Sequence, residues 1–130
     1  MKITTKGFYA VEIMRALAAW EKGLPMSLAD VEEKTGVPRS YVGLLALRLK
    51  RAGLAKSFRG NAGGYRIAKK AKDISLTDIF AASGEDVAPW PGKAQKRFRR
   101  PLMCPAHPVW QKLYRQTADF FKRTTLADFL

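Results

Sequence analysis

Arginines occur along a short predicted helix and again in the glycine-rich turn that follows it. Arg39, Arg48 and Arg51 fall within residues 39–51, and Arg59 begins the sequence RGNAGG. Guanidinium groups bind phosphates with paired hydrogen bonds, and an arginine on a narrow turn fits the minor groove of DNA. An α-helix fits the major groove, which is roughly 12 Å wide. The pattern therefore predicts contact with duplex DNA.

The predicted helix at residues 39–51 has two different faces. Val42, Leu45 and Leu49 recur at helical spacing and predict a stripe that faces the core. The opposite face then carries Ser40, Tyr41, Leu44, Arg48 and Arg51. Because any surface helix turns polar residues outward, this face indicates DNA binding only together with its neighbours in the sequence.

Two earlier helices would position this one. A first helix is predicted at about residues 4–20, with a threonine as its N-terminal cap. Ser27 and Asp30, three residues apart, form an approximate capping box for a second helix that ends at Gly36. Two short helices joined by a tight turn at residues 36–38 describe a helix-turn-helix.

The start of the first helix is a second candidate for phosphate binding. Its backbone amides have no partner within the helix, and Lys6 lies beside them. Most helix starts hold only water, so this role is the weaker of the two predicted for the N-terminal half.

A short β-hairpin is predicted after Gly53. Residues 54–58 and 65–67 read as strands, and glycines at 60, 63 and 64 lie in the turn between them. Ser75 and Asp78 then predict a fourth helix that ends near Gly84. The fold class is therefore mainly α with a small β-hairpin, with residues 1–84 forming a winged helix-turn-helix domain.

The last third of the chain changes in composition. Residues 85–104 are rich in proline, lysine and arginine and predict a basic loop prone to disorder. Residues 105–130 predict a long helix and a final turn that places Leu126, Phe129 and Leu130 inward. The helix carries an aromatic and apolar stripe at Trp110, Leu113, Thr117, Phe120 and Phe121. This stripe predicts a homodimer interface; the alternative is that the helix packs only on its own chain.

The overall charge narrows the class of partner. Lysine and arginine number 24 against 11 acidic residues, which gives a net charge of +13. Such an excess favours a polyanionic partner, and it suits nucleic acid or a membrane surface. One cysteine excludes an intramolecular disulfide, and no stretch reads as a signal peptide or a membrane span. A cytoplasmic protein that binds double-stranded DNA is expected.

With these elements in place, the sequence resembles the bacterial winged-helix transcription regulators of the IscR, NsrR and CymR type, the Rrf-two family. The matching stretches are MKITTKGFYAVEIM, TGVPRSYVGLLALRLKRAGL, SFRGNAGGYRIA, ISLTDIF, CPAH and TLADFL. The resemblance implies a DNA-binding dimer whose third helix enters the major groove and whose wing arginine enters the minor groove. The expected DNA-binding residues are Lys6, Arg39, Ser40, Tyr41, Arg48, Arg51, Ser57, Arg59 and Gly60.

Two departures from the family pattern are visible. Several members bind an iron–sulfur cluster through three cysteines and a histidine, but here only Cys104 and His107 match, and Gly92 and Phe98 stand at the other two positions. A cluster needs about four ligands, mostly thiolates, so no cofactor is expected and this pair is a weak metal candidate. In the predicted recognition helix, Gly43 and Leu44 stand where polar base-reading groups are expected.

Three functions compete. The leading one is a transcription regulator that lacks the cluster and responds to a protein partner, a metabolite or thiol oxidation. The runner-up is an architectural DNA-binding protein with little sequence preference, which the charge and the departures in the helix favour. An enzyme using Cys104 and His107 is the least supported, because the pair has no orienting group or oxyanion site in the sequence.

Overall fold

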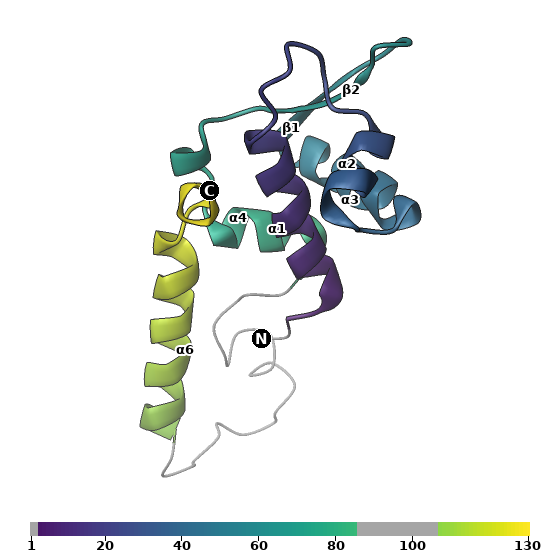
Figure 1. Ribbon diagram of the computed structural model, residues 1–130. Coiled ribbons are helices and arrows are strands. Elements are labelled where there is room, and N and C mark those ends of the chain that lie inside the picture. Colours follow the sequence, from purple (N-terminus) through teal and green to yellow (C-terminus); the bar gives the residue numbers. More distant parts are fainter. Residues whose placement is uncertain (1–2, 86–106) are drawn as a thin grey trace.

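The computed structural model of the 130-residue chain describes residues 3–85 and 107–130 (Figure 1). Most of the basic loop predicted at residues 85–104 lies outside these ranges, as does Cys104. The elements, in order, are α1 (Thr5–Ala18), α2 (Leu28–Thr35), α3 (Arg39–Arg51), β1 (Ala55–Phe58), β2 (Gly64–Ile67), η1 (Ala71–Asp73), α4 (Leu76–Ser83), α6 (His107–Arg123) and η2 (Leu126–Phe129). The predicted fold class, mainly helical with one hairpin, is confirmed.

The ends of the short helices are set by local hydrogen bonds. Ser27 and Asp30 form a reciprocal capping box at the start of α2, and Ser75 and Asp78 form another at the start of α4. Gly36 ends α2 with a φ of 72°, a left-handed conformation that glycine adopts without steric cost. These interactions lie within a few residues of one another, which is why the sequence pattern predicts them.

The core lies where α1 meets α2, α3 and α4. Its fully buried side chains come from all four helices and include Ile13, Val31, Leu45 and Ile79. Gly7 allows α1 to approach α4 closely, since a Cβ at this position would lie 2.5 Å from the ring of Phe80. Helix α3 therefore packs against the other helices of this core, and the packing fixes the orientation of its outer face.

The hairpin is antiparallel, with Ala55 opposite Ile67 and Ser57 opposite Tyr65. A third segment joins it, because Met26 and Tyr65 exchange backbone hydrogen bonds of 2.9 and 2.8 Å. A Cβ at Gly64 would collide with the Met26 carbonyl, so glycine is required for this close approach. Figure 1 shows the hairpin extending from the helical body beyond α2 and α3.

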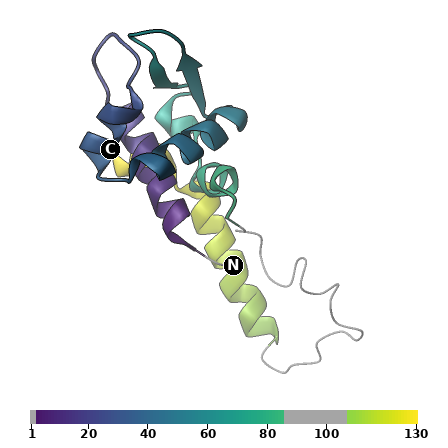
Figure 2. The ribbon, with the colours of Figure 1, turned by 90° about the vertical axis from the view of Figure 1, so that its right-hand side faces the viewer.

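Helix α6 projects away from the body and is attached at its C-terminal end (Figures 1 and 2). Ser75 and Thr125 form an isolated bridge, in which the Leu76 amide donates to the Thr124 carbonyl at 2.8 Å and the Leu126 amide to the Ile74 carbonyl at 2.9 Å. Leu126 is fully buried, as predicted. The prediction that Phe129 and Leu130 also point inward is wrong: Phe129 is 39% exposed and Leu130 is 62% exposed.

Candidate nucleic-acid interface

Helix α3 presents polar and cationic residues at its N-terminal end. Arg39 is exposed and forms an ion pair with Glu32 of α2, with 2.8 Å between Nε and Oε2. Ser40 is exposed, and the Tyr41 ring packs edge-on against Tyr9 with centroids 5.3 Å apart. The pair with Glu32 orients the Arg39 guanidinium but also neutralises part of its charge. Tyr41 is held in place by α1, with its ring still partly accessible.

The two arginines near the end of α3 have different surroundings. Arg51 is exposed, as expected for a residue that contacts DNA. Arg48 is half-buried, and its Nη1 donates a hydrogen bond to the carbonyl oxygen of Ser83 at 2.7 Å. Arg48 was predicted to contact DNA with Arg51, but the structure ties its guanidinium to the C-terminal end of α4. This hydrogen bond connects α3 with α4.

The hairpin turn carries an exposed arginine. Arg59 and Gly60 both lie at the surface of the tip, where Gly60 has a φ of 102°. The Gly63 amide donates to the Gly60 carbonyl at 2.9 Å and closes the turn. Ser57 is half-buried within β1. A narrow turn with one free guanidinium matches the shape expected of a wing that enters a groove.

A second arginine stabilises the base of the hairpin. The Arg66 guanidinium lies over the ring of Phe58, 5.7 Å from its centroid, and donates a hydrogen bond to the Gly23 carbonyl. Arg66 therefore fixes the hairpin against the α1–α2 connection, while Arg59 is left at the tip.

The N-terminal end of α1 already holds an anion from its own chain. The amides of Thr4 and Gly7 donate to Oε1 of Glu85, at 3.0 and 3.3 Å, and the Thr4 hydroxyl also donates to this oxygen. At the phosphate site predicted here, the Glu85 carboxylate accepts hydrogen bonds from the same amides that a phosphate would use. Lys6 is half-buried and lines a pocket at this point together with Tyr41, Arg48 and Glu85.

The predicted stripe of α6 consists of a buried part and an exposed part. Phe121 is only 6% exposed and packs edge-on against Phe80 of α4, with ring centroids 5.1 Å apart. It was predicted as a dimerisation residue, but it belongs to the core of its own chain. Phe120, by contrast, is 62% exposed, and Trp110 and Leu113 are also exposed. Thr117 is half-buried, and its hydroxyl donates to the Leu113 carbonyl at 2.8 Å.

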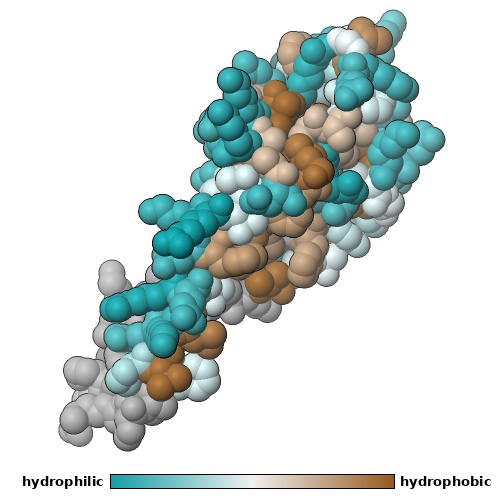
Figure 3. Space-filling model, turned by 60° about the vertical axis from the view of Figure 1, so that its left-hand side comes forward, coloured by the Kyte–Doolittle hydropathy of each residue, from teal (hydrophilic) through white to brown (hydrophobic). Residues whose placement is uncertain are grey.

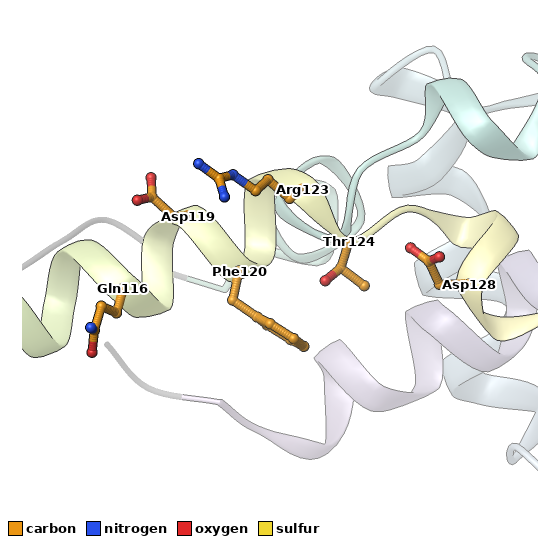
Figure 4. A pocket seen from close by; sticks show the side chains of 6 residues that line it. All are labelled: Gln116, Asp119, Phe120, Arg123, Thr124 and Asp128. Carbon is orange, nitrogen blue, oxygen red and sulfur yellow. The ribbon is translucent and has the colours of Figure 1, made fainter.

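The exposed part of the stripe is continuous with an open pocket at the base of α6. The pocket is lined by Gln116, Asp119, Phe120, Arg123, Thr124 and Asp128. Figure 4 shows the Phe120 ring projecting away from Asp119 and Arg123. Figure 3 shows apolar side chains along the α6 half of the molecule, between hydrophilic ones.

The described residues do not bring together a metal site around the two candidate ligands, Cys104 and His107. His107 is the first residue of α6, and Cys104 lies outside the described ranges. Across residues 3–85 and 107–130, His, Cys, Asp and Glu side chains form no group of three or more that could hold a metal ion. The whole chain contains one cysteine and one histidine, and this donor set does not fit an iron–sulfur cluster.

Sequence reasoning missed two features of this surface. It did not identify Glu85 as the partner of Thr4 and Gly7, which lie about 80 residues away along the chain. It also placed no weight on Leu47, which is exposed beside Leu44 on the outer face of α3. Hydrophobic periodicity could have revealed Leu47, because it falls opposite the buried stripe of the helix.

A helix-turn-helix with an exposed cationic helix and a two-stranded wing defines the winged-helix class of DNA-binding proteins. The profile of the Rrf2 family, described as an iron-dependent transcriptional regulator, matches residues 3–130. The chain belongs to this family.

Individual relatives agree with this assignment. The chain is 35% identical over 130 residues to the HTH-type transcriptional regulator IscR of Vibrio vulnificus (strain YJ016), covering 100% of this chain and 77% of the relative. The structure of CymR (YrzC), the global cysteine regulator of B. subtilis, has a TM-score of 0.80 at 27% identity, covering 99% of this chain and 95% of that one. T. potens IscR has a TM-score of 0.77 at 31% identity, covering 99% and 85%.

These relatives are transcriptional regulators rather than enzymes. In the described part of the chain, no helix combines the length and the apolar character needed to cross a membrane. The winged-helix fold and the membership of this family therefore indicate that DNA is the expected partner.

Proposed function

We propose that this chain binds duplex DNA as a homodimer at a near-palindromic promoter site, and that it regulates transcription without an iron–sulfur cluster. The observation that carries the proposal is the exposed Arg59 at the tip of the wing, next to a recognition helix whose outer face is also exposed. In Figure 2, α3 lies toward the viewer and the hairpin extends above it. One side of the molecule thus offers a helix and a ribbon to the same ligand.

The proposed contacts follow from exposure and charge. Arg39, Ser40, Tyr41 and Arg51 are exposed on α3, and Arg59 and Gly60 are exposed on the wing. Lys6 and Ser57 are half-buried at the edges of this surface and would meet the phosphate backbone. Arg48 is left out because its guanidinium is bonded to the Ser83 carbonyl. A net charge of +13 supports strong attraction to DNA and a steep decrease in affinity with salt.

The test replaces the wing arginine and compares specific with random DNA. Arg59→Ala should weaken binding to a site selected from random sequences by about 1–3 kcal/mol, because a groove-inserted guanidinium is lost. Arg115→Ala removes the same charge from an exposed position on α6 and serves as the matched control. Equal affinity of Arg59→Ala and the unsubstituted protein would contradict the role of the wing.

The dimer part of the proposal rests on the exposed stripe of α6. Trp110, Leu113 and Phe120 are large apolar residues on a helix that projects from the body, and a second copy of the chain could cover them through twofold symmetry. Two copies of α3 would then meet two half-sites about 34 Å apart, which is the geometric reason for a near-palindromic site.

The absence of a cluster is proposed from the donor set. Cys104 and His107 are the only cysteine and histidine in the chain, so two of the three cysteines in the family pattern are not available to one subunit. The absorption spectrum and iron content of anaerobically purified protein should show no cluster. A visible absorption band with stoichiometric iron would contradict this part. A regulator without a cluster would respond to another signal, such as a protein partner, a metabolite or oxidation of Cys104.

A second candidate function is an architectural DNA-binding protein with little sequence preference. Gly43 favours it, because this position of the recognition helix carries no side chain to read a base. Competition separates the two functions: a regulator retains its selected site in excess random DNA, whereas an architectural protein is displaced in proportion to DNA length.

A further inference from the structure

The centre of the outer face of α3 is apolar. Leu44 is 40% exposed and Leu47 is 37% exposed, although the neighbouring Leu45 and Leu49 are completely buried. With 3.6 residues per turn, Ser40, Leu44, Leu47 and Arg51 fall on one line along the helix, opposite the buried stripe. A hydroxyl stands at one end of this line, a guanidinium at the other, and two leucines between them.

Gly43 adds to the apolar character of this surface. A Cβ at this position would have no atom within 4 Å, so packing does not require glycine there. Because Gly43 has no side chain, the helix backbone next to the leucines can approach a binding partner closely. Cations surround the leucines, with Arg51 on α3 and Arg59 on the wing. They indicate that the partner of this face is a polyanion rather than the apolar face of another protein.

Leucine side chains in a major groove discriminate among base pairs in one way. They cannot form hydrogen bonds, and burying an amino or carbonyl group of a base against them without a partner is costly. The C5-methyl group of thymine is the one apolar feature that the major-groove edges of the bases present. An apolar contact is therefore favourable over thymine and unfavourable over the polar edges of a G·C pair.

We propose that Leu44 and Leu47 read the methyl groups of two neighbouring thymines in each half-site. Three residues of helix span about 4.5 Å, close to the roughly 3.4 Å between successive base pairs, so the two side chains meet adjacent steps. This inference rests on the proposed DNA-binding function and adds the sequence class of the site. The recognition helix selects T·A pairs by apolar contact, and its polar ends contact the backbone.

The test uses deoxyuridine, which pairs with adenine as thymidine does but lacks the methyl group. A duplex site is first selected from random DNA with the full-length chain, and each thymine is then replaced singly by uracil. At two adjacent positions in a half-site, the substitution should weaken binding by about fourfold, the effect of losing one buried CH₂-sized group. Replacing both should weaken binding by more than tenfold.

Protein variants identify the side chains responsible. Leu44→Ala and Leu47→Ala should each abolish the difference between thymine and uracil at one position, since alanine is too short to reach the methyl group. Both variants keep a good helix former at an exposed site and should fold normally. Arg51→Ala is the control, and it should weaken binding to the thymine and uracil duplexes by the same factor.

The possible results separate this inference from the proposed function. A selected site whose affinity changes by less than twofold at every uracil substitution would overturn the thymine reading and leave regulation intact. A thymine preference that persists in the double variant Leu44→Ala/Leu47→Ala would also overturn it. Failure to enrich any sequence would overturn both.

Discussion

At the scale of single residues, Arg48 and Arg51 show how position changes the role of the same side chain. They are three residues apart on α3, yet Arg48 donates to the Ser83 carbonyl and Arg51 is exposed. The hydrogen bond satisfies a carbonyl at the end of α4 that has no partner within its helix. Arg48 therefore contributes to the packing of the domain, and Arg51 is available to a ligand.

This difference predicts opposite effects on stability. Arg48→Ala should lower the free energy of unfolding by about 1 kcal/mol, because it removes a charge-assisted hydrogen bond between α3 and α4. Arg51→Ala should change it by less than about 0.5 kcal/mol, as is usual for an exposed residue. Urea unfolding followed by circular dichroism measures both. Equal stability of the two variants would show that the bond to Ser83 adds nothing.

Glu85 offers a second residue-scale prediction. Glu85→Gln removes the charge that the Thr4 and Gly7 amides stabilise, so the free energy of unfolding should decrease by about 1–2 kcal/mol. Glu33→Gln, at an exposed position of α2, loses the same charge and provides the comparison. If both variants unfold at the same urea concentration, the carboxylate is not a significant cap for α1.

Contacts of this kind explain why part of the candidate site could not be predicted. The wing arginine Arg59 follows from a local pattern of glycine and arginine, and the structure places it at the tip of the hairpin. The bonds of Arg48 to Ser83 and of Thr4 to Glu85 join residues that only the packed fold brings together. No periodicity in the sequence contains that information.

At the scale of elements, α2 and α4 begin with the same chemistry, a capping box formed by a serine and an aspartate. In the capping box of α2, the Ser27 hydroxyl donates to Asp30 at 2.6 Å, and the Asp30 amide donates back to the hydroxyl at 3.1 Å. The hydrogen bond from the Ser27 side chain, followed by that from its backbone, lowers the pKa of Asp30 below its usual value. The carboxylate form is thus favoured in the folded protein.

The lowered pKa predicts a loss of stability in acid. A carboxyl group with a lower pKa in the folded than in the unfolded chain stabilises the fold above the unfolded-state pKa, and this stabilisation disappears as the pH falls through the folded-state pKa. Urea unfolding measured downward from about pH 5 should therefore show a smaller decline in Asp30→Asn than in the unsubstituted protein. Asp119→Asn, on the exposed face of α6, controls for the loss of a charge. Identical pH profiles of all three proteins would contradict the prediction.

Helix periodicity predicted the elements better than it predicted their partners. The boundaries of α2 and α4 follow from serine and aspartate three residues apart, and both helices begin where expected. In α6 the same reasoning correctly finds an apolar stripe but cannot tell which side the chain itself covers. Phe121 faces α4, whereas Phe120, one residue earlier, points elsewhere and is exposed.

At the scale of the whole molecule, the exposed apolar face of α6 predicts the state of association. Light scattering of the purified protein should give twice the 14.5 kDa chain mass. Leu113→Ser/Phe120→Ser should give the mass of one chain with its helical circular dichroism retained, because two exposed apolar contacts are replaced by polar groups. Lys112→Ser/Arg115→Ser changes the polar face of the same helix and should remain dimeric. A single-chain mass for the unsubstituted protein at micromolar concentration would refute the dimer.

The bridge between Ser75 and Thr125 gives α6 the properties of a lever. A helix of 17 residues is about 25 Å long, and it is held at one end by backbone hydrogen bonds beside α4. A rotation of about 10° at this attachment displaces the far end of the helix by about 4 Å. In a dimer joined through α6, the angle at this attachment, where Phe121 also packs on Phe80 of α4, would therefore set the distance between the two recognition helices. That distance in turn would set the spacing of half-sites that the protein can bind.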